Sequence, residues 1–268
     1  MNKQQSYTWY AVFRVLVFWL LTMVCLALPS GLVKHSRGIY SPVIITMIAI
    51  VATLFLTFLF VRWQKMKVAD TGIVPGKKTL PKLGIGILIG SALAVLQPLA
   101  VFATGHISLI GNTDIPAREI LSSLTLYFLL ACREELVFRG FILRSIQAVS
   151  GPVQAMLVTS LLFIIEHIIG GMNWWPGIWG SGTGALLFGL AALVSRGLAL
   201  PIGIHFAWNA MQWILGFKNS AGIFRTIITK GHEDQLETIA SISYMVVMGL
   251  AITAFLYYRK KQTQATLN

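Results

Sequence analysis

Long apolar segments recur along the whole chain, and they constrain its fold more than any other feature. A helix needs about 20 mostly apolar residues to cross the hydrocarbon core of a bilayer. Charged residues make up only 11 % of this sequence, whereas soluble domains carry about 25 %. The composition excludes a soluble enzyme, a disordered tail and a secreted disulfide scaffold, and it predicts an all-α, polytopic integral membrane protein. About eight transmembrane helices are expected, at residues 10–32, 40–61, 83–104, 119–141, 153–174, 178–194, 201–217 and 239–258.

The basic residues are divided unequally between the two sets of connecting loops. Eight spans place both termini on one side, and 13 of the 21 Lys and Arg residues fall on that side, many of them in the linker 62–82. The opposite loops hold six, among them Lys34, Arg37 and Lys218. Because cytoplasmic loops are enriched in Lys and Arg, we expect the N and C termini to be cytoplasmic. The same rule explains the net charge of +12 without a nucleic-acid partner.

Small residues at a spacing of four indicate places where helices approach closely. Gly86 and Gly90 have this spacing in the third predicted span, and Gly180 and Gly184 have it near the sixth. We interpret both pairs as structural.

Ionisable side chains are concentrated in the fourth, fifth and seventh spans. A charged group at the centre of a bilayer costs roughly 3 kcal/mol or more, so each one inside a span needs a reason. The first, second, third and eighth spans hold only Arg14, near an end. The clustered polar residues are Arg133, Glu134, Glu135 and Arg139 in the fourth span, Glu166 and His167 in the fifth, and His205 with Asn209 in the seventh.

Helical spacing separates the two adjacent glutamates. Glu135 and Arg139 stand at i and i+4, so they share a helix face and can pair. Glu134 is rotated by about 100° from Glu135 and is the carboxylate left free to face something else. His205 and Asn209 also stand at i and i+4 and project together.

The turn between the fourth and fifth spans sets the heights of the polar residues. The strongest chain breaker there is Ser-Gly-Pro at 150–152. If both arms are continuous antiparallel helices, Glu134 and His167 stand level above this turn. For His205 to meet them, the hairpin must project further into the cytoplasm than the turn before the seventh span. The predicted site then lies near the cytoplasmic end of the bundle.

One free carboxylate, two histidines and an amide suit the hydrolysis of an amide bond. A glutamate in a low-dielectric cavity can act as general base toward water, and a neighbouring histidine can hold that water and carry its proton. A second histidine and an amide can donate hydrogen bonds to a developing oxyanion. Equally, Glu134, His167 and His205 could supply three ligands to a catalytic zinc ion. An aspartyl dyad is excluded because no aspartate lies in any span.

Three short motifs, in order and on separate spans, resemble a known family pattern. The CPBP (CAAX protease and bacteriocin-processing, or Abi) intramembrane endopeptidases, which include the type II CAAX prenyl endopeptidases, show a similar series. The resemblance covers about residues 117–217, and Phe138-Arg139-Gly140 and Pro201-Ile202-Gly203 lie in the expected flanks. The matching motifs are Glu134-Glu135-x-x-x-Arg139, Phe163-x-x-x-His167 and His205-x-x-x-Asn209.

The resemblance implies a role for each matching residue. Glu134 would activate water with the help of His167, His205 and Asn209 would form the oxyanion site, and Glu135 and Arg139 would be a supporting ion pair. The family has been described both as metalloproteases and as metal-independent glutamic proteases. No cofactor is expected here, and zinc stays an open alternative.

Glu166 departs from the family pattern, because an apolar or small residue is expected beside His167. It is an extra ligand, a group that tunes a neighbouring pKa, or a partner for Arg133 or Arg139.

The expected function is hydrolysis of a peptide bond near the cytoplasmic face, in CAAX-type or bacteriocin-related processing. The expected partners are the lipid bilayer and a peptide or membrane-protein substrate, and a prenylated substrate is one implication of the resemblance. The alternative is a non-enzymatic bacteriocin self-immunity protein that acts by binding. A proton-relaying transporter is disfavoured because such proteins show repeats or matched broken spans, and none is detected.

The expected organisation has three parts in the bacterial plasma membrane. Residues 1–116 hold the first three spans and the basic linker, and residues 117–217 form the catalytic helical core in spans four to seven. Residues 218–268 form a polar loop, the final span and a basic tail.

Overall fold

Helices make up nearly all of the protein, as the sequence predicts. The computed structural model describes residues 3–33, 38–218 and 222–265; Lys34 and Arg37, counted above in an opposite loop, lie outside these ranges. The α-helices are α1 (Lys3–Val33), α2 (Ser41–Trp63), α3 (Thr79–Leu96), α4 (Leu99–Phe102), α5 (Ala117–Glu135), α6 (Leu143–Ile169), α7 (Trp174–Pro176), α8 (Gly182–Ser195), α9 (Ala199–Ile214) and α10 (Glu233–Ala265). Shorter elements are the 3₁₀ helix η1 (Val68–Thr71) and the π-helices η2 (Leu136–Ile142) and η3 (Gly177–Ser181).

Six helical stretches among the described residues are long and apolar enough to cross a membrane. Each of the eight predicted spans coincides with helix. Two features explain why the structure has six such stretches and not eight. The stretch Ala117–Ile169 is continuous and contains both the fourth and the fifth predicted spans. The seventh falls in α9, whose 16 residues extend only about 24 Å. Since the hydrocarbon core is about 30 Å thick, α9 is too short to cross it alone.

The stretch Ala117–Ile169 folds back on itself at Gly151, inside the predicted turn. Gly151 has φ 83° and ψ 175°, values outside the helical region, and only glycine adopts them readily. Residues at nearly equal distances from this turn then meet across the two arms. The rings of Phe138 and Phe163 lie 4.9 Å apart, and Arg133 pairs with Glu166. The predicted antiparallel hairpin is therefore confirmed.

A π-helix interrupts this hairpin directly after the glutamate pair. All seven residues of η2 (Leu136–Ile142) are buried. π-Helices are rare and occur frequently at functional sites, and sequence periodicity did not predict this one.

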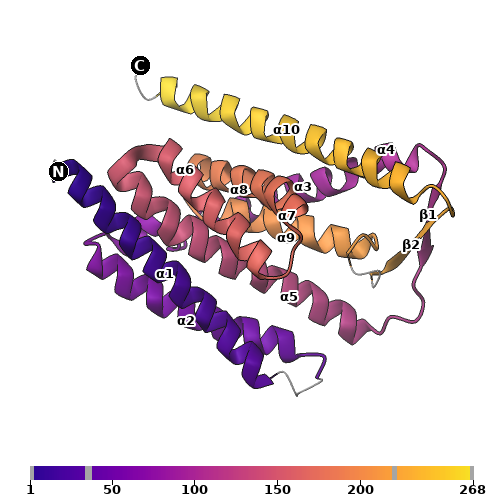
Figure 1. The fold of residues 1–268 in the computed structure, drawn as a ribbon, viewed down its shortest axis with the longest axis horizontal. Coiled ribbons are helices and arrows are strands. Elements are labelled where there is room, and N and C mark those ends of the chain that lie inside the picture. The colour runs from indigo at the N-terminus through magenta and orange to yellow at the C-terminus, as the bar shows by residue number, and fades with distance from the viewer. Residues whose placement is uncertain (1–2, 34–37, 219–221, 266–268) are drawn as a thin grey trace.

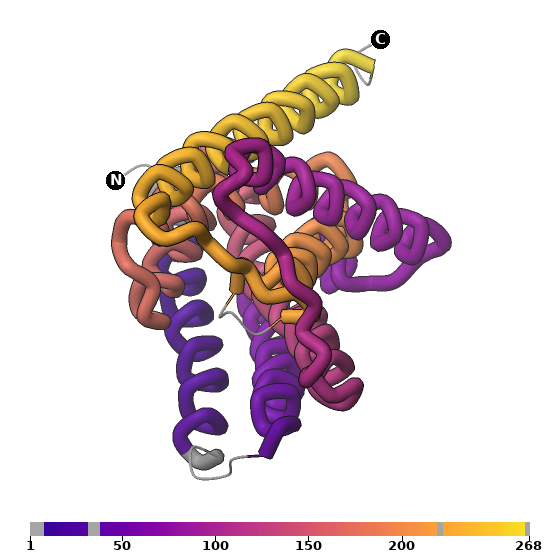
Figure 2. Tube along the Cα trace, turned by 90° about the vertical axis from the view of Figure 1, so that its right-hand side faces the viewer, coloured from indigo at the N-terminus to yellow at the C-terminus, as the bar shows by residue number. Residues whose placement is uncertain are grey.

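The helices surround the hairpin in pairs. α1 packs along α2, α1 also contacts α6, and α2 contacts α5. α10 lies across α8 on the opposite side, so that the indigo and purple pair and the yellow helix flank the core in Figure 2. Both described ends of the chain lie toward the left of Figure 1, but they are on opposite sides of the view in Figure 2.

Two short strands lie at the other end of the molecule, to the right in Figure 1. β1 (Ile107–Gly111) pairs antiparallel with β2 (Phe224–Ile228), with Ile107 opposite Ile228 and Gly111 opposite Phe224. The strands connect the segment after α4 with the segment after α9. The region 218–238, predicted to be a polar loop, therefore contains a strand and the first turns of α10.

Glycines bring the backbones of α3 and α9 into direct contact. A Cβ atom at Gly90 would collide with the carbonyl oxygen of Ile204 and lie 2.9 Å from its Cα. A Cβ atom at Gly86 would collide with the carbonyl oxygen of Leu200. The predicted close packing is confirmed here. The same prediction is wrong for Gly180, where a Cβ atom would meet nothing within 4 Å. The neighbouring helix α10 reaches this point through a long side chain instead, since the Tyr244 hydroxyl donates to the Gly180 carbonyl oxygen at 2.7 Å.

Replacing Gly90 by alanine is expected to destabilise the protein by about 1–3 kcal/mol, because overpacking forces the two backbones apart. The displacement would move Ile204 and with it the adjacent His205. Thermal unfolding in detergent measures the effect. Gly84→Ala is the matched control, since it changes the same helix at a position with nothing within 4 Å. Equal melting temperatures for the two variants would contradict this account.

Candidate active site

The ion pair between Glu135 and Arg139 lies at the centre of the cluster. Arg139 Nη1 donates to Glu135 Oε1 at 3.0 Å, and both side chains are fully buried. Arg139 Nη2 also donates to the carbonyl oxygen of Ala185 in α8, at 3.0 Å. The guanidinium carbon lies 4.7 Å from the ring centre of Phe163 and 5.4 Å from that of Phe188, a favourable position for a cation.

Glu135 also fixes one of the two histidines of the predicted site. Its Oε1 atom lies 2.9 Å from His205 Nδ1. Because the Arg139-paired carboxylate accepts hydrogen bonds, His205 carries a proton on Nδ1. The His205 ring stacks on Phe188, with 4.4 Å between centroids and 14° between planes. Glu135 and Arg139 thus connect the hairpin to α8 and α9 and hold the His205 ring in place.

Glu134 is in a different environment from its neighbour. Its side chain is 16 % exposed, and within the described parts of the chain it makes no hydrogen bond. Its Oε2 atom is buried and unpartnered and lies 3.8 Å from His205 Nε2. His205, His167, Arg133 and Arg139 all interact electrostatically with this carboxylate. Glu134 therefore has ionisable neighbours on several sides while its oxygens stay available to a further donor.

His167 presents a nitrogen that can accept a proton. Its Nδ1 atom lies 2.9 Å from the carbonyl oxygen of Phe163, one turn earlier in α6. A carbonyl can only accept, so Nδ1 carries the hydrogen and Nε2 of the neutral ring has a lone pair. The Phe163 ring packs against the imidazole at 4.3 Å.

Asn209 follows His205 on the same side of α9 and is held by a lysine. Lys218 Nζ donates to Asn209 Oδ1 at 3.1 Å, and the same ammonium lies 4.9 Å from the ring centre of Tyr127. The sequence placed Lys218 in a loop of the opposite side, unconnected to the site. Its position depends on a turn after α9, and no local pattern in the sequence indicated it.

The structure selects one of the alternatives for Glu166. It pairs with Arg133, and its other oxygen, Oε2, accepts a hydrogen bond from Trp19 Nε1 at 2.9 Å. Arg133 Nη2 also donates to the carbonyl oxygen of Thr22 at 3.2 Å. This network attaches α1 to both arms of the hairpin, directly beside Glu134 and His167. Trp19 is a contributor that the sequence analysis missed, because apolar spans contain many tryptophans without such partners.

The positions of the same side chains also bear on whether they could hold a zinc ion. In the described ranges, no three His, Cys, Asp or Glu side chains gather closely enough to hold a metal ion. The three ligands considered for zinc, Glu134, His167 and His205, do not form such a group, and Nδ1 of His205 is bonded to Glu135.

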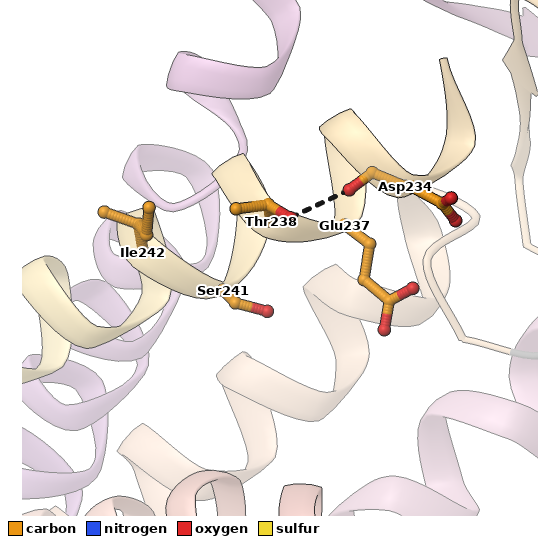
Figure 3. A pocket seen from close by; sticks show the side chains of 5 residues that line it. All are labelled: Asp234, Glu237, Thr238, Ser241 and Ile242. Atoms are coloured by element: carbon orange, nitrogen blue, oxygen red, sulfur yellow. Dashed lines mark hydrogen bonds between the residues drawn. The ribbon is translucent and has the colours of Figure 1, made fainter. Parts of the chain in front are cut away.

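A separate pocket lies on the first turns of α10, away from this cluster. Figure 3 shows its side chains on one helix, with Thr238 Oγ1 donating to the carbonyl oxygen of Asp234 at 2.9 Å. It includes none of the predicted site residues. Its lining consists of Asp234, Glu237, Thr238, Ser241 and Ile242.

The fold and the cluster define an integral membrane protein whose polar centre lies between α5, α6 and α9. Comparison with known families then identifies the segment that carries this centre. Residues 116–211 match the family described as "Type II CAAX prenyl endopeptidase Rce1-like", which confirms the resemblance to the CPBP and CAAX protease group for this part of the chain. The match covers a little over one third of the 268 residues and includes all six predicted site residues. Among curated proteins, none matches the chain. An Rce1-like segment supports a CAAX-type intramembrane endopeptidase, which acts on a peptide or protein substrate.

Proposed function

We propose that this protein hydrolyses a peptide bond by means of water that Glu134 activates. The contrast between the two adjacent glutamates carries the proposal. Glu135 is fully buried and bonded to Arg139 and His205, whereas Glu134 is partly exposed and faces an imidazole at 3.8 Å. A partly buried carboxylate with free oxygens is suited to accept a proton from water.

The proposed reaction begins when Glu134 takes a proton from water and the water oxygen attacks the carbonyl carbon of the substrate. The lone pair on His167 Nε2 assists by accepting a hydrogen bond from the same water. The carbonyl oxygen becomes an oxyanion, which Asn209 Nδ2–H and His205 Nε2–H stabilise. Since Nδ1 of His205 already donates to Glu135, a donor role for Nε2 requires the imidazolium form. The proton held by Glu134 passes to the leaving nitrogen, the C–N bond breaks, and an acid and an amine are released.

The proposal also states which side of the membrane the termini and the site face, and which class of substrate is cleaved. Both termini and the tip of the α5–α6 hairpin lie on the cytoplasmic side, in agreement with the loops that are rich in Lys and Arg. His205 lies near the start of α9 on that side, so cleavage takes place toward the cytoplasmic face of the bacterial plasma membrane. The family match supports a CAAX-type substrate that carries a prenyl group.

Turnover of a broad pool of prenylated and unmodified peptides by the detergent-purified protein tests the proposal. Glu134→Gln is assayed in parallel, and both proteins are first shown to be folded. Cleavage by the wild type and not by the variant is the expected result. If the folded wild type cleaves nothing in the pool, the proposal fails. An immunity phenotype that survives Glu134→Gln would then favour the binding alternative.

Treatment with a zinc chelator is expected to leave turnover unchanged. The proposed steps use only Glu134, the two histidines and Asn209, and each of these side chains has a proton-transfer or donor role without a metal. Turnover is measured before and after dialysis against the chelator, with a zinc-dependent peptidase as control. Loss of turnover that added zinc restores would show a metalloenzyme and overturn the glutamate mechanism.

A further inference from the structure

Lys218 reaches the candidate site from outside the matched family segment, which ends at residue 211. Its Nζ atom lies 3.1 Å from Asn209 Oδ1 and 4.9 Å from the ring centre of Tyr127 in α5. Among the described residues, no carboxylate lies within ion-pair distance of this ammonium. The amide of Asn209 is its hydrogen-bonding partner, and Glu134 acts on it electrostatically.

An ammonium group fixes which way an amide side chain faces. Lysine can only donate hydrogen bonds, whereas asparagine has an accepting oxygen and a donating nitrogen that can exchange places by rotation. With Lys218 bonded to Oδ1, the Nδ2 group of Asn209 is directed away from the lysine. Nδ2 is the atom that can donate to a developing oxyanion.

The chain turns back after α9, and this turn places Lys218 beside Asn209. Gly216 has φ 76°; its amide bonds to Trp213 O, and the amide of Phe217 bonds to Gln212 O. These two bonds form a Schellman motif, which ends a helix on a left-handed residue. A Cβ atom at Gly216 would collide with the carbonyl oxygen of Phe224 in β2. The turn is therefore held between the helix and the strand pair.

We propose that Lys218 is a positioning residue, which keeps the Asn209 amide oriented as a hydrogen-bond donor. This inference rests on the proposed function, because it assumes that Asn209 stabilises an oxyanion. Lys218 does not touch the reacting atoms in this assignment and acts through Asn209.

The charge of Lys218 makes this role dependent on pH. Burial lowers the pKa of Lys218 from its ordinary value, and the negative charge of Glu134 partly opposes that shift. The groups facing the ammonium are Glu134 and Tyr127 from α5 and Asn209 from α9. When pH rises through the pKa of Lys218, the neutral amine can accept a hydrogen bond, and the amide is free to turn its oxygen toward the substrate. Turnover should then fall at alkaline pH.

Kinetics of Lys218→Met and Lys218→Arg test the proposal. Lys218→Met is expected to lower kcat by about 10-fold to 100-fold, the worth of a hydrogen bond to a charged group, with little change in KM. Lys218→Arg keeps a charged donor, so it should retain most of the turnover and extend it to higher pH. Lys230→Met removes an exposed lysine from the segment after β2 and is the matched control, with wild-type kinetics expected.

A double-mutant cycle with Asn209→Ala separates positioning from a direct role. If Lys218 acts through Asn209, Lys218→Met should have almost no further effect once Asn209 is alanine. If the two substitutions lower kcat by factors that multiply in the double mutant, the proposal is overturned. An unchanged kcat in Lys218→Met would also overturn it. If Lys218→Met does not fold, the kcat of Lys218→Arg decides, and a large loss of turnover in this folded variant, which keeps a charged donor, would overturn the proposal. A folded wild type without turnover rejects the proposed function itself, which is a different outcome.

Discussion

Replacing Glu134 by glutamine is expected to lower kcat by about 10²-fold to 10⁴-fold, the usual contribution of a general base. Glutamine has nearly the same shape, so the substrate should still bind and KM should change little. The melting temperature should not fall, because Glu134 makes no hydrogen bond within the described parts of the chain. Turnover of a cleaved peptide, measured together with thermal unfolding in detergent, gives both quantities.

The neighbouring glutamate provides the matched control. Glu135→Gln removes a fully buried charge that is bonded to Arg139 and His205, so it should lower the melting temperature as well as turnover. A reversed pattern, with Glu134→Gln unstable and Glu135→Gln inactive but stable, would exchange the roles of the two residues. Full activity in Glu134→Gln would reject the mechanism.

The second large effect is expected for Arg139→Ala, which should destabilise the protein by about 3–5 kcal/mol. Removing one partner of a buried ion pair leaves the other charge without compensation, and here the remaining group is the fully buried Glu135. The variant also loses the bond to Ala185 O and leaves a cavity between the rings of Phe163 and Phe188. Since proteins are stable by only about 5–15 kcal/mol, the variant should unfold at a much lower temperature or denaturant concentration than the wild type.

Denaturant unfolding in detergent, followed by tryptophan fluorescence, measures this loss. Arg62→Ala is the control, since Arg62 is an exposed arginine at the end of α2 and should change stability by less than about 0.5 kcal/mol. If Arg139→Ala unfolds at the same denaturant concentration as Arg62→Ala, the pair does not support the hairpin.

Features of the fold that depend on neighbouring residues could be predicted from the sequence. The apolar segments gave the positions of the helices, Ser-Gly-Pro at 150–152 gave the turn, and the i, i+4 rule gave the contact of Glu135 with Arg139. The glycine spacing gave the contact of α3 with α9. Each of these follows from a few residues of local sequence and the geometry of a helix.

What could not be predicted depends on contacts between distant parts of the chain. The position of the π-helix η2 could not be recognised from a change in the apolar pattern, because all seven of its residues, including Arg139, are buried. The strands β1 and β2 form only because more than 100 residues of chain return the second beside the first. The partners of Glu166 and Asn209 are Trp19 and Lys218, which lie in segments that hydropathy treats as an ordinary span and an ordinary loop.

The contacts between the two arms of the hairpin limit how this segment can change in length. Arg133 meets Glu166 and Phe138 meets Phe163, so five residue steps of the first arm, which enter the π-helix η2, lie beside three steps of the second. One residue added to a single arm would rotate everything beyond it by about 100° and shift it by about 1.5 Å, which would separate Glu134 from His167. Viable insertions and deletions must therefore restore these contacts between the arms, or be confined to the turn itself. The spacing of the hairpin thus fixes where the two side chains proposed to activate water, Glu134 and His167, lie relative to each other.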